Sequence, residues 1–547
     1  MRSPLALALV ASFSLFGCGD DAGEDPFDVT PTDAQIAYCP GDATDALTRA
    51  ERALRQLTLE QKAALMAGTA PLPMGGSWKT MSISALGIPA YRMIDGPRGA
   101  SLVAGHATPF PVAAARGATF DPELERRVGA AIARETRGLG ANVLLAPTVN
   151  VLRHPRWGRA QETYGADPLH IALFGAAFVE GVQAEGIVST VKHYALNSIE
   201  NGRLSIDVLA DARTMREIYL PPFERIVKEA KVATVMTAYN SVNGSFASEN
   251  AELLSILYDD WGFAGFTMSD WMYGTHDTVK AVHAGLDLEM PNPKIYGPAL
   301  AAAVQAGEVD EALLDRSVRR LLFTAFCYDV GSIEGDRSLV ETDEARALAL
   351  EVAQRSLVLL QNEGGALPLS DEEGFSIAVL GRLADAENIG DTGSSHVNPS
   401  PGTVVTPYQG LVARAGSNPV ELLEASDPEL AEKLASFDAV VLVVGYTAED
   451  EGEGEGSFGA GDRASLSLRD EDLALIEAVA PLHERVILVI EGGSAVVLTD
   501  VVEHVEAIVM AWYPGVEGGT AIADLLFGDV NFSGRLPTSF PADEAHL

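Results

Sequence analysis

Six polar residues follow short apolar segments in the first 330 residues, at positions where side chains could do chemistry. They are Asp95, Asn150, Lys192, Tyr239, Asp270 and Glu289. Asp270 comes after the segment 265–268, and its carboxylate is of a type that can attack as a nucleophile. An aspartate after a strand is also typical of a helix cap or a turn, so this position alone leaves its role open.

A second set of carboxylates lies far along the chain, in a glycine-spaced acidic segment. Residues 447–456 include Glu449, Glu451, Glu453 and Glu455. Such a segment is typical of a solvated, flexible loop. Neighbouring carboxylates also disfavour each other's charged form. This effect suits a proton donor, which must stay protonated near neutral pH. The pattern does not single out one of the four glutamates.

The spacing of the first set predicts a barrel. Apolar or β-branched segments occur at 142–146, 187–191, 232–237, 265–268 and 285–288, with helical patterns between them. This alternation is the signature of repeated β/α units. In a (β/α)8 barrel the carboxyl ends of all strands face one side, so polar residues distant in sequence meet there. A flat doubly wound sheet gives the same local pattern, and the length and number of units favour a TIM-like barrel over residues 51–330.

The chain beyond residue 330 predicts a second, smaller unit. Residues 331–355 form a linker that is polar at first and then helical, and buried-strand candidates follow at 377–380, 439–444, 486–490 and 507–510. Helices fit between these segments. The predicted fold class is therefore α/β, with an N-terminal (β/α)8 TIM-like barrel followed by an α/β sandwich domain at 356–547.

The overall charge excludes several kinds of partner. The 547 residues include 38 Lys and Arg against 77 Asp and Glu, a formal net charge of −39. Nucleic acid and anionic surfaces would be repelled, whereas a neutral ligand would feel little of this field. No zinc-type spacing of ligands and no nucleotide-binding glycine motif in the right context is found, so no metal or cofactor is implied.

The first residues predict export. Residues 1–17 contain a short apolar core, as in a secretory signal, and residues 15–18 (LFGC) resemble a bacterial lipoprotein box. On this interpretation a lipid on Cys18 is the one membrane attachment, residues 18–50 contain a tether, and the protein lies in the periplasm or at the cell surface. The alternative is an ordinary signal peptide with an incidental cysteine.

Two further cysteines, Cys39 and Cys327, complete the set. Disulfides persist in exported proteins, so we state their pairing as a hypothesis. Two separate buried thiols are the alternative, because free cysteine is among the most buried residue types.

Motifs in both predicted domains resemble the family 3 glycoside hydrolases, the β-glucosidase group, from about residue 53 to the end of the chain. In chain order they are Asp95–Gly99, Asn150–Arg159, Glu162–Gly165, Lys192–Tyr194, Thr237–Asn240, Ser269–Trp271, Gly393–Ser395, Gly461–Arg463, Trp512–Gly515, Glu517–Gly519 and Gly534–Pro537. One motif alone would be weak. Their number, order and spread carry the resemblance.

The resemblance implies an exo-acting retaining β-glycosidase, foremost a β-glucosidase that releases terminal glucose from a small neutral saccharide. Retention needs an ionised carboxylate that attacks and a protonated carboxyl that assists the leaving oxygen, about 5 to 5.5 Å apart. The resemblance assigns the first role to Asp270. It assigns the second to Glu451, counted back from Gly461–Arg463, with Glu453 as the next choice. The residues implied to bind sugar are Asp95, Arg159, Lys192, His193, Tyr239 and Trp271, and those implied to position them are Arg98, Arg156 and Glu162.

Lys192 and His193 set a condition on the backbone. Adjacent residues of a strand point to opposite faces, so both reach one ligand only where the strand ends or bulges. Cationic Lys192 and Arg159 beside Asp270 would lower its pKa and keep it ionised for attack. The alternatives are an internal salt bridge for Lys192, a satisfied core position for His193 and plain core for Trp271.

Other functions remain open at this stage. A β-xylosidase would share the chemistry and differ in the subsite around Asp95. The related β-N-acetylglucosaminidases have a glycine-rich loop with a histidine after the Lys-His pair, which residues 194–197 lack. A non-catalytic glycan-binding protein would need neither Asp270 nor an acidic loop. Family members usually continue past the Gly534–Pro537 motif, often with a fibronectin-like domain, so we expect the sequence ending at Leu547 to be truncated.

Overall fold

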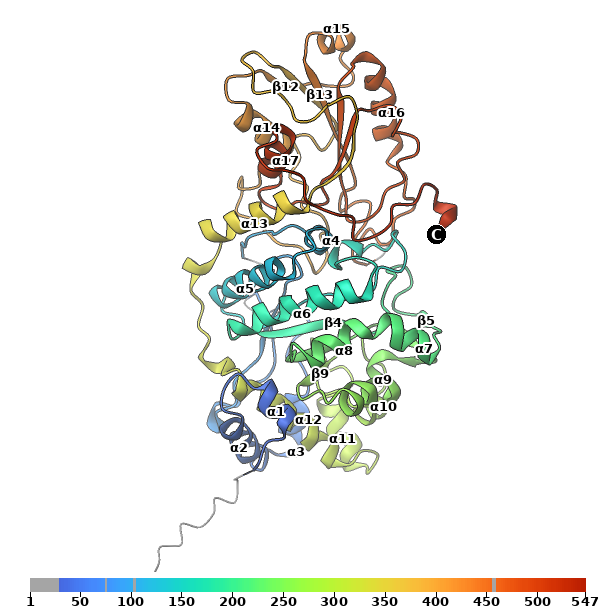
Figure 1. The fold of residues 1–547 in the computed structure, drawn as a ribbon. Helices are drawn as coiled ribbons and strands as arrows, with labels where there is room; N and C mark the ends of the chain where they lie inside the picture. The colour runs from blue at the N-terminus through green and yellow to red at the C-terminus, as the bar shows by residue number, and fades with distance from the viewer. Residues whose placement is uncertain (1–28, 74–75, 102–104, 455–458) are drawn as a thin grey trace, which may run out of the picture.

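Two parts of the molecule are stacked along one long axis, with the barrel at one end and a second sheet at the other (Figure 1). The structure is a computed structural model that describes residues 29–73, 76–101, 105–454 and 459–547. The predicted signal peptide, Cys18, the tether as far as residue 28, and Glu455 lie outside the described residues. Within the described part, no helix combines the length and apolarity needed to cross a membrane.

The N-terminal part is a TIM-like barrel with an irregular closing side. Its sheet has the order β1-β2-β3-β4-β6-β9, parallel from β2 to β9 and antiparallel between β1 and β2. Single bridges complete the ring, between Met268 and Leu288, Ala67 and Glu289, and Gly68 and Thr80. The segment 285–288 therefore contributes a bridge instead of the expected strand. The strands are β1 (Trp78–Lys79), β2 (Arg92–Asp95), β3 (Val143–Leu145), β4 (Val188–Tyr194), β6 (Thr234–Thr237) and β9 (Phe266–Met268), with a small sheet of β5 (Asp207–Val208), β7 (Ser241–Val242) and β8 (Ser245–Phe246) beside them.

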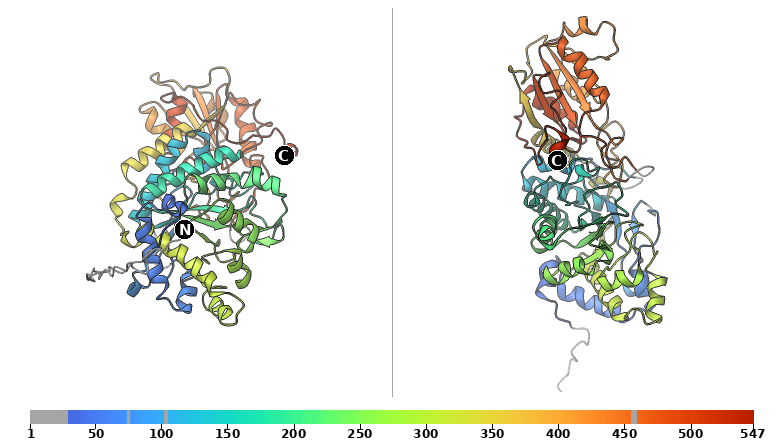
Figure 2. Two further views of the ribbon diagram at one scale, coloured as in Figure 1. Left: turned by 60° about the horizontal axis from the view of Figure 1, so that its bottom comes forward. Right: turned by 90° about the vertical axis from the view of Figure 1, so that its right-hand side faces the viewer.

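Helices cover the outside of the barrel (Figures 1 and 2). The helices α5 and α6 each begin with an aspartate N-cap followed by proline, Asp121-Pro122 and Asp167-Pro168, and both caps accept a backbone N–H. This pairing satisfies an orphan donor and presets the first helical φ. The helices are α1 (Asp33–Tyr38), α2 (Ala43–Leu54), α3 (Leu59–Leu65), α4 (Ala113–Ala118), α5 (Pro122–Gly138), α6 (Pro168–Ala184), α7 (Ala212–Thr214), α8 (Pro221–Lys228), α9 (Ala251–Ser255), α10 (Thr278–Ala284), α11 (Pro298–Gln305) and α12 (Glu311–Cys327).

The second part is a six-stranded sheet between two layers of helices. Its order is β10-β15-β14-β13-β11-β12, parallel except for β10. Every residue of β13 and β14 is buried, as in parallel sheets covered on both faces. Alternate residues of β13 enter different cores, Val440 on one face and Val441 on the other. The elements are β10 (Val358–Asn362), β11 (Ile377–Leu380), β12 (Val420–Leu422), β13 (Ala439–Gly445), β14 (Val486–Glu491), β15 (Ala507–Met510), α13 (Asp343–Ser356), α14 (Pro407–Ala415), α15 (Leu430–Leu434), α16 (Asp470–Val479) and α17 (Gly518–Phe527).

The two parts meet along a polar boundary near the C-terminus (Figure 2). Buried Arg98 of the barrel donates to the carbonyl oxygens of Ser395 and Asp391. Arg156 pairs with Glu544, close to the end of the chain. Loops of the second domain are therefore held against the barrel mouth by hydrogen bonds.

A disulfide joins the N-terminal helices to the barrel. Cys39, just after α1, bonds Cys327 at the end of α12, with the Cα atoms 5.1 Å apart and a sequence separation of 288. This confirms the pairing hypothesis. Tyr38 beside it donates a hydrogen bond to the carbonyl of Ala233, which ties α1 to the start of β6.

We predict that Cys39→Ser and Cys327→Ser each lower the free energy of unfolding by roughly 2 to 5 kcal/mol, because the bridge restricts the unfolded chain. Denaturant unfolding under non-reducing conditions measures the change. The double variant should match either single variant. Free thiols at both positions in non-reducing peptide mapping would contradict the bridge.

Candidate active site

The predicted polar residues gather at the carboxyl ends of the barrel strands. Asp95 ends β2, Lys192 and His193 lie near the end of β4, and Asp270 follows β9 by two residues. The pairing of β4 with β6 shifts register between Val191 and Tyr194. This irregularity is the condition under which both residues of the Lys-His pair reach one side of the barrel.

Asp270 has one carboxylate oxygen engaged and one without a partner. Oδ1 accepts from the backbone N–H of Trp271 at 2.7 Å, and Oδ2 has no hydrogen bond. His193 Nε2 lies 3.7 Å from Oδ2, and the Asp270 side chain is 8% exposed. Burial raises the pKa of Asp270, and the charges of Arg203 and Arg159 oppose that rise. The site therefore contains a nearly enclosed carboxylate with a free oxygen.

Lys192 and His193 differ in charge. Lys192 Nζ lies 3.7 Å from Oδ1 of Asp95. Burial lowers the pKa of His193 well below its usual value, and the nearby Arg159 and Lys192 add to the effect, so its imidazole is neutral. Burial raises the pKa of Asp95 to about 7, although Lys192 opposes the rise. These groups can both donate to and accept from hydroxyls.

Two barrel arginines bind a glutamate of the second domain. Oε1 of Glu453 accepts from Arg159 Nη1 at 3.2 Å and from Arg203 Nη1 at 3.1 Å. Its other oxygen accepts from the backbone N–H of Ser394 at 2.7 Å. Burial alone would raise the pKa of Glu453, but the two arginines and Ser394 bring it well below the usual value. Glu453 is thus ionised and reaches across the domain boundary.

Glu451 points into the second domain and not toward the barrel. Its side chain is 0% exposed and pairs with Arg463 at 2.6 Å. Its Oε1 accepts from the Gly493 N–H at 2.8 Å and from the Tyr513 hydroxyl at 2.5 Å. The structure therefore separates two glutamates that are two residues apart: Glu451 is fixed inside its own domain, and Glu453 lies among barrel residues.

Tyr239 and Trp271 line the same region. The Tyr239 hydroxyl donates to the carbonyl oxygen of Trp271 at 2.9 Å. Burial and then the Asp270 charge raise the pKa of Tyr239. Trp271 packs edge-to-face against Trp78, with ring centroids 5.4 Å apart, and its indole Nε1 has no partner. Trp271 is therefore partly core and partly site wall.

The positioning residues divide into two groups. Glu162 holds Arg159 through two bonds of 2.9 and 2.8 Å, and Arg98 fixes the 391–395 segment, as expected. Arg156 instead pairs with Glu544, and not with Arg159, Glu162 or Glu453. Glu289 accepts from backbone N–H groups at 294–296 and organises that loop.

Sequence reasoning missed Arg203, Glu200 and Asp391. Glu200 is fully buried and holds Arg203 at 2.8 Å, and Asp391 accepts from the Glu453 backbone N–H at 3.2 Å. The spacing of Glu200 and Arg203, three residues apart after the Lys-His segment, was the one available signal. Glu162, Asp391 and Glu453 offer oxygens within 4.8 Å of one another, but Arg159 lies against two of them and balances their charge.

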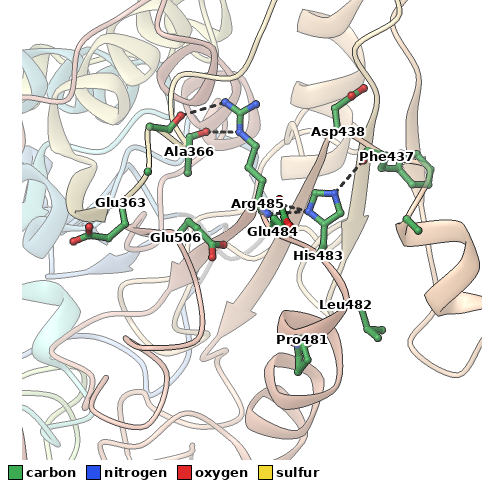
Figure 3. A pocket seen from close by; sticks show the side chains of 13 residues that line it. Glu363, Ala366, Phe437, Asp438, Pro481, Leu482, His483, Glu484, Arg485 and Glu506 are labelled. Carbon is green, nitrogen blue, oxygen red and sulfur yellow. Dashed lines mark hydrogen bonds between the residues drawn. The ribbon is translucent and has the colours of Figure 1, made fainter.

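A hollow of about 860 Å³ lies in the second domain, away from these residues (Figure 3). It is lined by segments that precede β13, β14 and β15, at the amino ends of the strands. Arg485 there donates to the carbonyls of Ala366 and Pro368, and both His483 ring nitrogens contact backbone carbonyls. Ligands of α/β sheets bind at the opposite, carboxyl ends. This hollow is therefore not the candidate site.

Comparison with known proteins identifies the family. Residues 76–323 match the Glycosyl hydrolase family 3 N terminal domain, and residues 357–547 match the Glycosyl hydrolase family 3 C-terminal domain. The chain belongs to glycoside hydrolase family 3. The family 3 match covers both the barrel and the second sheet.

Relatives within family 3 have more than one activity in their names. Thermostable beta-glucosidase B of Acetivibrio thermocellus is 35% identical over 91% of this chain and 66% of its own length. An exo-alpha-(1->6)-L-arabinopyranosidase of Bifidobacterium longum is 34% identical over 90% of this chain and 66% of its own length. This family 3 chain thus spans about two thirds of the length of these relatives.

Solved family 3 structures share the fold. Beta-glucosidase 3B from Thermotoga neapolitana, in complex with glucose, superposes with a TM-score of 0.83 at 30% identity, over 91% of this chain and 76% of that one. The beta-D-glucoside glucohydrolase from Trichoderma reesei gives 0.84 at 30% identity, over 93% and 75%.

We predict that Glu451→Ala destabilises the protein, because it leaves the buried Arg463 guanidinium without its carboxylate. The expected loss of unfolding free energy is about 3 to 5 kcal/mol. Glu453→Ala should cost less, since Arg159 and Arg203 keep Glu162 and Glu200. Denaturant unfolding of both variants compares them, and equal stability of Glu451→Ala and the wild type would contradict the assignment of Glu451 to the interior.

Proposed function

We propose that this chain is an exo-acting retaining β-glycosidase, foremost a β-glucosidase. The observation that carries the proposal is a pair of carboxylates from different domains, Asp270 and Glu453: Glu453 contacts Arg159 and Arg203, and the charges of the same two arginines act on Asp270. Retaining cleavage requires such a carboxylate pair on opposite sides of a glycosidic bond. The beta-glucosidases among the relatives support this choice.

Asp270 takes the role of nucleophile. Its free Oδ2 attacks the anomeric carbon, the glycosidic C–O bond breaks, and the leaving oxygen takes a proton from the acid. Water then attacks the glycosyl ester, gives its proton to the same acid/base residue, and frees Asp270. Arg159 and Arg203 lower the pKa of Asp270 against its burial and so favour the ionised form that attacks.

Glu453 takes the role of acid/base in place of Glu451. Its carboxylate lies among barrel side chains, whereas that of Glu451 pairs with Arg463 and accepts a hydrogen bond from Tyr513. In the substrate-free arrangement Glu453 is ionised, the form that deprotonates water in the second step. For the first step, a bound sugar must draw Arg159 or Arg203 off Glu453, which raises its pKa and allows it to carry a proton.

The remaining side chains form the sugar subsite. Asp95 and Lys192 can accept from and donate to neighbouring hydroxyls, and neutral His193 can do either. Arg159 adds hydrogen-bond donors, and Tyr239 and Trp271 form an aromatic wall of the sugar subsite. A site that pairs hydroxyls in this way favours a neutral sugar over an apolar ligand.

Sugar specificity is the open choice within this proposal. β-Xylosidase is the first alternative, and the named arabinopyranosidase relative adds α-L-arabinopyranosides to the substrates worth testing. A non-catalytic glycan-binding role is the alternative outside enzymes. We also propose export, with attachment through Cys18, and the Cys39–Cys327 disulfide supports an oxidising compartment.

The test is hydrolysis of aryl β-D-glucoside, β-D-xyloside, N-acetyl-β-D-glucosaminide and α-L-arabinopyranoside by wild type and variants. Asp270→Ala should lower kcat/KM on the preferred substrate at least about 10⁴-fold, because no covalent intermediate forms. Asp260→Ala, at an exposed barrel residue, is the matched control and should retain activity. Undiminished hydrolysis by Asp270→Ala would overturn the mechanism, and a wild type inactive on every glycoside would leave the binding role.

Azide separates the two glutamates. Glu453→Ala should lose about 10² to 10⁴-fold in turnover of an aryl glycoside with a poor leaving group. On an aryl glycoside with a good leaving group, added azide should restore turnover and give a β-glycosyl azide. Glu451→Ala should yield no azide product. The reverse pattern would return the acid/base role to Glu451.

A further inference from the structure

The carboxylate of Asp462, eight residues after Gly454, accepts three backbone hydrogen bonds from the barrel. Its Oδ1 accepts from the backbone N–H groups of Gly158 and Glu200, each at 2.9 Å, and its Oδ2 accepts from the Asn201 N–H at 2.9 Å. All three donors belong to barrel loops, whereas Asp462 belongs to the second domain. One side chain therefore joins two separate barrel loops to the second domain.

The backbones meet so closely at this point that a side chain would not fit. A Cβ placed on Gly158 would lie 2.2 Å from the carbonyl oxygen of Gly461 and 2.4 Å from that of Gly452. Gly158 thus lies directly under both limbs of the loop. The hydrogen bond from Gly158 to Asp462 and the absence of a side chain on Gly158 therefore both hold the loop close to the barrel backbone.

The residues on both sides of Glu453 are fixed as well. The Gly452 N–H donates to the Gly461 carbonyl at 3.2 Å, which connects the two limbs of the loop. The Gly454 N–H donates to Oε2 of Glu200 at 3.0 Å. Glu200 therefore binds the loop through its carboxylate and Asp462 through its N–H. The Glu453 backbone is therefore held from both sides, and its own N–H donates to Asp391 of the second domain at 3.2 Å.

We propose that Asp462 is a positioning residue that sets where the Glu453 carboxyl lies relative to Asp270. This inference rests on the acid/base role proposed for Glu453. Loss of the Asp462 carboxylate leaves three backbone donors without acceptors at the boundary, and the loop shifts to satisfy them. A shift of about 1 Å at a reacting group costs on the order of 10²-fold in rate. Protonation of the leaving group by Glu453 becomes slower, whereas attack by Asp270 does not, because Asp270 lies on a different element.

The test compares Asp462→Ala and Asp462→Asn on aryl glycosides of the preferred sugar, from 2,4-dinitrophenyl to phenyl. Asp462→Ala should lose about 100-fold in kcat/KM on the phenyl glycoside and less than about threefold on the dinitrophenyl glycoside. The second loss is small because dinitrophenolate departs without being protonated. Asp462→Asn keeps one amide oxygen for the two Oδ1 bonds and should fall between wild type and Asp462→Ala. A plot of rate against leaving-group basicity should therefore steepen in that order.

Two readouts keep the outcomes distinct. Asp470→Ala, at an exposed position in the first turn of α16, is the control and should leave the slope unchanged. If Asp462→Ala lowers all rates equally, or leaves the slope at its wild-type value, the positioning role is overturned even though hydrolysis still depends on Asp270. If wild-type hydrolysis does not depend on Asp270, the proposed function fails first. Thermal unfolding of each variant shows whether a rate loss follows from loss of folded protein.

Discussion

The structure depends on a buried ion network that crosses the boundary between its two domains. Glu453 of the second domain lies against Arg159 and Arg203 of the barrel, and each arginine also holds a barrel glutamate. Buried charges are tolerated only when they are paired and hydrogen-bonded, so neither domain can present its half of the network to an apolar interior alone. The network therefore fixes the two domains together at the point where their loops converge.

The same network sets the charge of the candidate site. Burial raises the pKa of Asp95 to about 7, that of Glu200 to about 7 and that of Asp391 to about 6. Below these values the three groups are neutral. As pH rises through them, each gains a negative charge, which for Glu200 and Asp95 interacts with Arg203 or Arg159 and for Asp391 with Arg98. The site thus combines carboxyls whose pKa lies near neutrality with a glutamate that stays ionised.

Local sequence pattern was enough for much of the fold. The predicted strands 377–380 and 507–510 coincide with β11 and β15, because a buried parallel strand is a continuous apolar segment. The segment 285–288 contains Gly285 and Asp287 and forms only a single bridge, between Leu288 and Met268, while the next residue, Glu289, bridges Ala67 at the start of the barrel sequence. The disulfide joined residues 288 positions apart and could be stated only as a hypothesis.

The site was less accessible to sequence reasoning than the fold. Strand ends indicated Asp95, Lys192 and Asp270, and the resemblance added His193; the structure places Lys192 beside Asp95 and His193 beside Asp270. The acidic segment alone did not distinguish Glu451 from Glu453, and the resemblance favoured Glu451, because both lie in one glycine-spaced segment and their partners come from distant parts of the chain. Arg463 and Tyr513 hold the first, and Arg159 and Arg203 hold the second. Partners of this kind have no local signature.

In the proposed mechanism a sugar is bound covalently by Asp270 while Glu453 lies across from it. Trapping with 2,4-dinitrophenyl 2-deoxy-2-fluoro-β-D-glucoside tests it, because the fluorine slows release of the glycosyl-enzyme. Peptide mass spectrometry of the inactivated protein should find one fluoroglucosyl group on Asp270. A label on a different carboxylate, or hydrolysis of glucosides with no covalent species formed by this reagent, would contradict the account.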